Sequence, residues 1–455
     1  MNLPDKVHFV GVGGAGMSAI AKVLVERGLS VSGSDLKRSR VATVLEAMGV
    51  HLSIGHDAAN LGDALLVVAS AAIPDGNPEL VAARERDIPV ITRGEALARV
   101  LQGSRSIVVA GTHGKTSTTS MIVSALHHSG YDPTYLVGGG LNESGTNARA
   151  GRDDDLSVAE SDESDGSFLL LHPHVAVVTN IELDHVDHWG SLEELTRAFE
   201  TFLTQTDDDG AAVLPVHESE LIAVAASARR SVMTFGDGGD VSAGELSFDQ
   251  GGSTFSLQTP MGSAGVTLAV PGTHNVSNAL AAAAACLVAG ASLELVAAGL
   301  GRYRGVERRF QRKGEARGVT IVDDYAHHPT EVRSTLEAAR TGGWRRVVAT
   351  FQPHRYSRTV ALAEGFGSAF GDADRVIVTD VYGAGEQPMP GISGKLVSDA
   401  VCTALPGRPV AYMPHRAELV GYLESVLRPG DLLLTLGAGD VTSLGDELLA
   451  RWGAS

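Results

Sequence analysis

The sequence is poor in cysteine, in uninterrupted apolar runs and in positive charge. Only Cys286 and Cys402 occur, so there is no CxxC or Cys/His zinc pattern, and at most one disulfide is possible. Both cysteines lie in apolar runs, and we expect buried thiols. The net charge of −18 argues against nucleic acid as the main partner, because nucleic-acid-binding proteins need a basic face.

Membrane insertion is not expected either. The most apolar run, residues 279–301, is mostly alanine, carries Glu294 and is interrupted by Gly290. It predicts two packed helices rather than a membrane span. The N-terminal stretch MNLPDKVHFVGVGG has no apolar core of the kind found in signal peptides. We therefore expect a cytoplasmic protein, for which an acidic balance is ordinary.

The length of 455 residues is sufficient for three domains. Short apolar strands alternate with helical stretches over the first hundred residues, and this βαβ rhythm restarts at 104 and again after 314. Such alternation predicts α/β domains with parallel sheets. Residues 236–272 instead resemble antiparallel strands. We expect domains at 1–103, 104–313 and 314–455.

A glycine-rich loop lies between the first strand and the first helix, in the string FVGVGGAGMS. Gly11 permits a tight turn, Gly13 lets the backbone approach a diphosphate, and Gly16 lets the helix and strand pack closely. Asp35 ends the second strand, where an acidic residue can hold a ribose hydroxyl. The motif predicts a diphosphate site without saying which diphosphate. The alternatives are the NAD site of a dehydrogenase and a tight turn without a ligand.

A second glycine loop, GTHGKTS, follows the first strand of the central domain. Val109 stands where the usual G-x-x-x-x-G-K-[ST] loop has its first glycine, so this loop is shorter. Lys115 would supply charge for the terminal phosphates of a nucleotide, and Thr116 a hydroxyl for Mg²⁺. Lys115 is the only lysine between Lys37 and Lys313, which argues against a chance match. Two polyanion sites in successive domains indicate a two-substrate reaction driven by ATP.

Carboxylates and imidazoles follow the next two strands, an arrangement that suits Mg²⁺ beside a phosphate loop. Glu160 and His185 are the candidates we favour. A solvated acidic loop with helix-capping residues explains Asp162, Asp165 and His188 as well. The same two strand ends also carry Glu163, Asp184 and Asp187.

Further polar clusters lie toward the C-terminus. Asn275 and Asn278 are placed at a helix start, where either alone could be an N-cap. Arg308 and Arg309 lie near the predicted domain boundary. Two clusters at the ends of neighbouring strands predict one face of a cleft. Their members are Asp323, Asp324, His327, His328, His354, Arg355, Tyr356 and Arg358.

Together these strings resemble the Mur ligase family of ATP-dependent amide-bond-forming enzymes. The resemblance extends over nearly the whole chain. It rests on GVGGAGMS, GTHGKTSTT, AESDESDGSF, TNIELDHVD, GTHNVSNA, GVERRF, DDYAHHPTE, FQPHRYSRT and GAGD, in that order. It implies an N-terminal Rossmann-like domain that binds UDP, a central P-loop ATPase domain of α/β type and a C-terminal Rossmann-like lid.

The resemblance also implies a role for each matching residue. The UDP-sugar site would comprise Gly11, Gly13, Gly14, Ala15, Gly16, Asp35, Ser70, Thr146 and Asn147. The ATP site would comprise Gly111, Thr112, His113, Gly114, Lys115, Thr116, Ser117, Asn275, Asn278, Arg309 and Asp324. Metal ligands would be Thr116, Glu160 and His185, and the amino-acid side would comprise His328, Arg355 and Arg358. Catalytic roles would fall to Lys115, His185, His354 and Arg355.

Within the family, the strings look closest to members that join L-alanine to the lactyl carboxylate of UDP-N-acetylmuramate through an acyl phosphate. This implies ATP and Mg²⁺ as cofactors, peptidoglycan precursor synthesis as the process, and a monomer or weak homodimer. One departure is that several relatives carry a carbamylated lysine in the central domain, whereas this chain has no lysine from 116 to 312. Glu200 stands near that position, and we assign it no role.

Three other functions remain as alternatives. A dehydrogenase would use the first domain only and would leave the Gly-Lys-Thr loop without a role. A nucleoside triphosphatase with only a binding or regulatory function would leave the first glycine loop and the third-domain clusters without a role. Within the family, the competitor is the recycling ligase that adds an intact tripeptide to the same sugar nucleotide.

Overall fold

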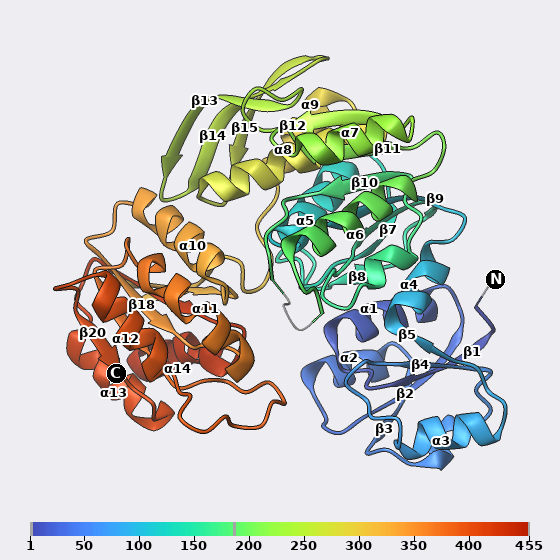
Figure 1. The fold of residues 1–455 in the computed structure, drawn as a ribbon, viewed down its shortest axis with the longest axis horizontal. Helices are drawn as coiled ribbons and strands as arrows, with labels where there is room; N and C mark the ends of the chain where they lie inside the picture. The colour runs from blue at the N-terminus through green and yellow to red at the C-terminus, as the bar shows by residue number, and fades with distance from the viewer. Residues whose placement is uncertain (1–2, 185–187, 454–455) are drawn as a thin grey trace. The chain divides into compact units, whose positions relative to one another are not determined.

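The computed structural model describes residues 3–184 and 188–453. The chain divides into two compact units. Figure 1 shows the helices and strands with their labels. The first unit consists of Met1–Gly244, Ser256–Val266 and Ser277–Tyr303. The second consists of Glu245–Phe255, Thr267–Val276 and Arg304–Ser455.

The N-terminal part of the first unit is a five-stranded parallel sheet, ordered β3-β2-β1-β4-β5. Its strands are β1 (Lys6–Val10), β2 (Ser30–Asp35), β3 (His51–Ile54), β4 (Leu66–Ala69) and β5 (Val90–Thr92). Its helices are α1 (Ala15–Glu26), α2 (Arg40–Ala47), α3 (Pro78–Glu85) and α4 (Arg93–Leu101), with the 3₁₀ helix η1 at Ala58–Leu61. The expected parallel sheet is confirmed. Strand β3 was not expected, because this short edge strand has no buried residue to give an apolar pattern.

The central sheet has seven strands in the order β12-β11-β10-β6-β9-β7-β8, parallel except for the pairing of β7 with β8. The strands are β6 (Arg105–Ala110), β7 (Pro133–Leu136), β8 (Ala148–Arg149), β9 (Asp153–Glu160), β10 (Val175–Val178), β11 (Ala211–Pro215) and β12 (Ser231–Phe235). The helices that follow them are α5 (Lys115–His128), η2 (Ser167–Leu170), α6 (Leu192–Thr204) and α7 (Ser219–Ser227). Strands β6 and β10 are apolar and buried almost throughout, as expected for a parallel sheet covered on both faces.

Residues 242–268 form a three-stranded sheet of consecutive strands, β13 (Ser242–Asp249), β14 (Gly252–Thr259) and β15 (Gly262–Leu268). The alanine-rich run that follows forms α8 (Thr273–Val288) and α9 (Leu293–Leu300), which confirms two helices broken near Gly290. Among the described residues, every helix is too short or too polar to cross a membrane. Cys286 is buried as expected, but Cys402 is exposed, so the expectation for that thiol was wrong.

The C-terminal sheet has six strands in the order β16-β17-β21-β18-β19-β20. They are β16 (Gln311–Ala316), β17 (Val319–Asp324), β18 (Arg346–Phe351), β19 (Arg375–Val378), β20 (Val410–Tyr412) and β21 (Asp431–Leu436). Only the edge pair β16–β17 is antiparallel within this sheet. Its helices are α10 (Pro329–Thr341), α11 (Tyr356–Ala369), α12 (Lys395–Ala404), α13 (Arg416–Val426), η3 (Asp440–Thr442) and α14 (Ser443–Gly453).

Candidate functional site

The Gly-Lys-Thr loop connects the C-terminal end of β6 to the N-terminus of α5. Gly111 and Gly114 have φ angles of +128° and +81°, which favour glycine. A Cβ atom at Gly111 would lie 2.2 Å from Thr179 Oγ1, and one at Gly114 would lie 2.4 Å from Asn278 Oδ1. Helix α5 begins at Lys115, so the unpaired N–H groups of its first turn follow the loop directly. The shortened loop therefore still presents a helix N-terminus to an anion.

The segment after β10 holds this loop in place. The Thr112 N–H donates to the carbonyl oxygen of Asn180 at 3.0 Å, and the His113 N–H donates to Asn180 Oδ1 at 2.9 Å. The Asn180 amide and the Thr179 hydroxyl both donate to the His113 carbonyl oxygen. Sequence reasoning did not identify Thr179 or Asn180, although the pairing of β10 with β6 places them next to the loop.

Lys115 is bound to a buried carboxylate. Its Nζ donates to Glu163 Oε2 at 2.7 Å and to the carbonyl oxygen of Gly111 at 2.7 Å, and Asp162 Oδ1 lies 4.0 Å away. The Glu163 side chain is 1% exposed. Burial by itself would lower the pKa of Lys115, but the carboxylates of Glu163 and Asp162 outweigh burial and raise that pKa. The lysine therefore keeps its positive charge at neutral pH.

Glu160 ends β9 with an incompletely satisfied carboxylate. Its Oε2 atom is buried and has no hydrogen-bond partner among the described residues. Space for the carboxylate exists because Gly138 lacks a side chain, since a Cβ there would lie 2.2 Å from Glu160 Oε1. Thr116, the other described metal candidate, begins α5 with Lys115 and is buried. The predicted ligand His185, together with Asp187, lies outside the described residues.

The first glycine loop lies at the C-terminal edge of the N-terminal sheet. Gly11 has a φ of +81°, and a Cβ there would lie 3.4 Å from Ser70 Cβ, so Ser70 borders the turn. The Gly13 N–H donates to Asp35 Oδ2 at 2.9 Å. Gly14 is the N-cap of α1, which begins at Ala15. In this structure the Asp35 carboxylate therefore binds the loop backbone itself.

The expected reason for Gly16 was wrong. We expected its lack of a side chain to allow close packing between helix and strand. A Cβ at Gly16 would instead meet the Arg93 side chain, 3.0 Å from both Cδ and Nη1. Arg93 begins α4, and its Nη2 donates to Asp165 Oδ2 at 3.1 Å. Sequence reasoning missed Arg93, whose position directly after β5 was the one available signal.

Asn147 of the central sheet region contacts α1 of the N-terminal sheet region. Its Oδ1 accepts from Lys22 Nζ at 2.7 Å, and its Nδ2 donates to the carbonyl oxygen of Ala15 at 3.2 Å. The neighbouring Thr146 hydroxyl donates to the Ala148 carbonyl oxygen at 2.9 Å. The structure thus brings Asn147 to the start of α1, next to the first glycine loop.

In the second unit, Asp324 organises the chain around the end of β17. Its two oxygens accept the N–H groups of Phe310 at 2.7 Å and Ala326 at 2.8 Å. Burial raises the pKa of Asp324 to about 6, against the opposing charge of Arg309. The Arg309 guanidinium lies over the Tyr325 ring, 5.2 Å from its centroid. Asp324 and Arg309, two of the residues predicted to bind ATP, therefore lie together.

The predicted adenine residues have local structural roles here. Asn275 lies in the first turn of α8 and donates from Nδ2 to the carbonyl oxygen of Pro271 at 2.8 Å. Asn278, in the first unit, accepts from the Thr118 hydroxyl at 3.3 Å and packs on Gly114. Asn278 thus lies at the phosphate loop.

The predicted amino-acid side comprises residues at the N-termini of α10 and α11. His328 is the N-cap of α10 and accepts from the Thr330 N–H. The His354 ring stacks on Tyr382 with centroids 5.8 Å apart, and burial lowers the pKa of His354 to about 3, so this imidazole is neutral. Arg355 is exposed, has a φ of +65°, and donates its N–H to the carbonyl oxygen of Tyr382 at 2.8 Å. Tyr382 was not identified from the sequence.

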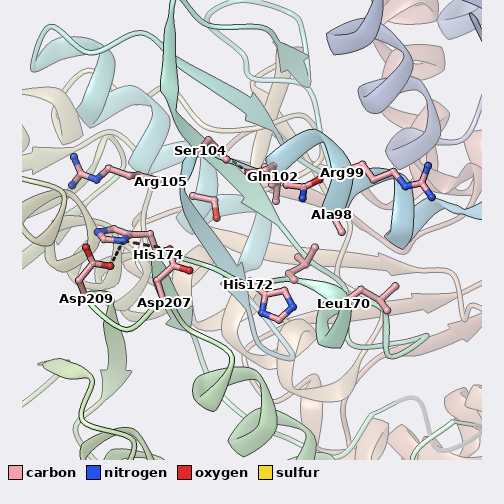
Figure 2. Close-up of a pocket in the computed structure, with 14 residues that line it drawn as sticks. Ala98, Arg99, Gln102, Ser104, Arg105, Leu170, His172, His174, Asp207 and Asp209 are labelled. Carbon is pink, nitrogen blue, oxygen red and sulfur yellow. Dashed lines mark hydrogen bonds and ion pairs between the residues drawn. The ribbon is translucent and has the colours of Figure 1, made fainter. Parts of the chain in front are cut away.

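A cavity of about 660 Å³ lies at the N-terminal ends of the central strands, whereas the phosphate loop lies at their C-terminal ends (Figure 2). It is lined by residues that precede β6, β10 and β11. His174 Nδ1 lies 3.6 Å from Asp207 Oδ2 and 3.7 Å from Asp209 Oδ1, a group that could hold a cation. Because both carboxylates are exposed, we interpret this group as a surface ion-pair cluster.

Three family models match successive parts of the chain. They are described as the Mur ligase family catalytic domain at residues 6–105, the Mur ligase middle domain at 109–286 and the Mur ligase glutamate ligase domain at 308–439. Together they match most of the sequence, so this chain belongs to the Mur ligase family of ATP-dependent ligases.

Particular relatives narrow the similarity. The UDP-N-acetylmuramate–L-alanine ligase of Rubrobacter xylanophilus is 51% identical, over 98% of this chain and all of that protein. The enzyme of the same name from Mycolicibacterium smegmatis is 48% identical, over 98% of this chain and 95% of that protein. Among solved structures, UDP-N-acetylmuramate–alanine ligase from Thermotoga maritima matches with a TM-score of 0.82 and 30% identity over 99% of both chains.

Proposed function

We propose that this chain is an ATP-dependent ligase that joins L-alanine to the lactyl carboxylate of UDP-N-acetylmuramate in peptidoglycan precursor synthesis. ADP and phosphate are the other products. The observation that supports this most directly is the presence of two glycine loops in one compact unit, with Asn147 bridging from the ATPase sheet to the helix of the sugar-nucleotide loop. Full-length relatives that carry this enzyme's name support the same conclusion.

The reaction needs activation because an anionic carboxylate is a poor electrophile. In the first step, a carboxylate oxygen forms a bond to the γ-phosphorus of ATP while the bond to ADP breaks. Two anions must approach, and the Lys115 ammonium would neutralise part of their charge. Lys115 Nζ now donates to Glu163 and to the carbonyl oxygens of Gly111 and Thr112. These three bonds use all of its N–H groups, so it must exchange one of the partners for a phosphate oxygen. The neutral amine of alanine then attacks the acyl carbon, and phosphate leaves.

A magnesium ion fits the residues at the end of β9. The buried Glu160 oxygen that has no partner among the described residues is suited to a hard cation, and the Thr116 hydroxyl would supply a second oxygen. We propose these two residues as ligands, with His185 as the third candidate. Magnesium would screen the phosphate charge during the phosphoryl transfer. Glu163 bound to Lys115 would fix the position of the ammonium group.

The second unit would supply the amino-acid site. We propose that His354, Arg355 and Arg358 form it, with His328 positioning the start of α10. Because His354 is neutral, it does not repel the amino group of alanine when that group is protonated. Arginine side chains suit the alanine carboxylate. Arg309, Asp324, Asn275 and Asn278 would complete the ATP site. Because acyl phosphates hydrolyse, closure of this domain over the reactants would protect the intermediate.

We assign the sugar-nucleotide domain to residues 1–103, the ATPase domain to 104–313 and the amino-acid domain to 314–455. Gly11, Gly13, Gly14, Ala15, Gly16, Asp35, Ser70, Thr146 and Asn147 would contact the sugar nucleotide. A cytoplasmic location follows from the proposed substrates, since ATP and UDP-sugars are made there. A monomer or weak homodimer is our expectation for its assembly.

Phosphate release tests the proposal. The purified chain is incubated with ATP, Mg²⁺ and UDP-N-acetylmuramate, and then with L-alanine, glycine, L-serine or an alanyl tripeptide. We expect the largest kcat/KM with L-alanine. Faster release with the tripeptide would assign the chain to the recycling reaction, and no release with any acceptor would overturn the proposal.

A further inference from the structure

Arg93 contacts both the helix that follows the first glycine loop and the segment after β9. Its Nη1 and Cδ atoms pack on Gly16, where a Cβ would come within 3.0 Å, and its Nη2 donates to Asp165 Oδ2 at 3.1 Å. Gly16 belongs to the first turn of α1, whose unpaired N–H groups would face the diphosphate. The Arg93 side chain is 29% exposed, so a ligand at that helix start can reach it.

Asp165 belongs to the loop that carries the partner of the ATP-site lysine. Glu163 in this loop accepts from Lys115 Nζ at 2.7 Å. The carbonyl oxygen of Glu163 accepts from the Gly166 N–H at 3.1 Å and from the Trp189 indole at 2.9 Å, so the loop is fixed internally. Arg93 and Lys115 are thus attached to the same short loop at positions two residues apart.

The backbone beside Arg93 packs tightly on the same region. A Cβ at Gly94 would lie 2.6 Å from Ser167 Cβ, so the start of α4 contacts η2 without an intervening side chain. The Ser167 N–H donates to Asp165 Oδ1 at 3.0 Å. A shift of the α4 N-terminus would therefore be transmitted to Asp165 through packing as well as through the ion pair.

The Asp35 carboxylate adds negative charge at the first loop, which a nearby cation would offset for an anionic ligand. Asp35 accepts from the Gly13 N–H at 2.9 Å and so places a carboxylate inside the loop that should receive a diphosphate. Arg93 remains charged at any working pH, and its planar guanidinium can bind two acceptors at once. A diphosphate at α1 would therefore share Arg93 with Asp165.

We propose that Arg93 is a positioning residue that couples sugar-nucleotide binding at the first loop to ATP binding at the second, by sharing its guanidinium between the diphosphate and Asp165. This inference rests on the proposed function. Occupation of the first loop would fix the Arg93–Asp165 pair, and with it the loop that holds Glu163 against Lys115. Because coupling is reciprocal, ATP would strengthen sugar-nucleotide binding by the same factor.

Calorimetry measures this coupling directly. The dissociation constant of the non-hydrolysable analogue AMP-PNP with Mg²⁺ is determined with and without saturating UDP-N-acetylmuramate. For the wild type we expect tightening of about 5-fold or more, and below about 2-fold for Arg93→Ala and Asp165→Asn. The double variant should lose no more than either single variant. Arg93→Lys should restore part of the coupling, because it keeps the charge without the planar fork.

A matched control is Arg84→Ala, which removes an exposed ion pair with Asp75 in the same N-terminal domain and should leave the coupling unchanged. Coupling that persists in Arg93→Ala and Asp165→Asn would overturn the inference about Arg93 but would leave the proposed function intact. So would an equal loss of AMP-PNP affinity with and without sugar nucleotide, which indicates a purely structural role. A wild type that fails to bind UDP-N-acetylmuramate would refute the proposed function first, and the inference with it.

Discussion

Asn278 and Gly114 are packed so closely that any side chain at position 114 would collide with the Asn278 amide. The separation between a Cβ at Gly114 and Asn278 Oδ1 would be 2.4 Å, and the φ of Gly114 is +81°. The same Asn278 oxygen accepts from the Thr118 hydroxyl in the first turn of α5. Asn278, in the part of α8 that belongs to the first unit, thereby packs against the phosphate loop.

Gly114→Ala should therefore lower turnover by about 100-fold or more, since displacing the loop misplaces Lys115 relative to the phosphates. Steady-state phosphate release measures this. Gly130→Ala is the matched control: Gly130 follows the C-terminal end of α5 and has a φ of +89°, but a Cβ there would meet nothing within 4 Å. Equal losses in the two variants would mean that backbone strain, not the contact with Asn278, causes the effect.

Lys115→Ala should abolish ligation and also destabilise the protein. Removing the ammonium leaves the Glu163 carboxyl, 1% exposed, without its cation. Burial raises the pKa of Glu163 to about 7 even beside Lys115, so the variant either protonates this carboxyl or keeps an unpaired buried charge, for which about 3 to 5 kcal/mol is the upper cost. Lys115→Ala/Glu163→Gln should recover much of the melting temperature but none of the activity. Lys395→Ala, which removes an exposed pair with Asp399, should change neither. A double variant no more stable than Lys115→Ala would contradict the buried-pair interpretation.

Asp324 should make stability depend on pH. Burial raises the pKa of Asp324 to about 6 in the folded state, above about 3.9 in the unfolded state. The stability contribution is therefore fully present below about pH 4 and is lost as the pH rises through about 6. Between about pH 4 and pH 6, the free energy of unfolding of the wild type should fall by roughly 2 kcal/mol relative to that of Asp324→Asn.

Melting temperatures of both proteins at pH 4, 5, 6 and 7 measure that difference. The constant loss of one hydrogen bond in Asp324→Asn does not affect the comparison, since only the change with pH counts. Asp372→Asn, whose native side chain is 43% exposed, is the control for the loss of one surface carboxylate. A flat difference for Asp324→Asn would show that its carboxyl is not perturbed.

Arg355→Ala and Arg358→Ala should raise the KM for L-alanine by about 10-fold or more, because each removes a permanent charge suited to a carboxylate. The KM for UDP-N-acetylmuramate should change by less than about 2-fold, because neither arginine is proposed to contact that substrate. Initial rates at varied alanine concentrations decide. Arg333→Ala, an exposed arginine of the same unit, serves as control. If neither variant affects the alanine KM or kcat, the amino-acid site lies elsewhere.

The glycine loops were predictable because their chemistry is local. Gly11 and Gly114 have left-handed conformations that sequence spacing alone suggests, and each loop joins a strand to a helix. The end of β9 was also predictable, since Glu160 is the last residue of this strand and directly follows the buried Val158 and Ala159. These features depend on residues within one βα unit, where periodicity and glycine spacing carry the information.

The supporting residues could not be predicted, because their roles arise from distant segments. Asn180 contacts His113 only because β10 pairs with β6. Arg93 reaches Gly16 because α4 packs beside α1, and Tyr382 stacks on His354 from a loop after β19. A single sequence can place such a residue at the end of a strand, as it does Arg93, but it does not show which distant residue it contacts. The same limit explains the wrong expectation for Gly16, whose neighbour is a side chain seventy-seven positions away.

The backbone of Arg355 has a consequence for the evolution of this enzyme. With φ +65° and ψ 139°, it adopts a conformation that glycine tolerates far better, at a cost of about 1 to 3 kcal/mol for another residue. Arg355→Gly should therefore raise the melting temperature of the amino-acid domain while it weakens alanine binding. Selection for thermostability would then favour glycine at this position, whereas selection for catalysis would favour arginine.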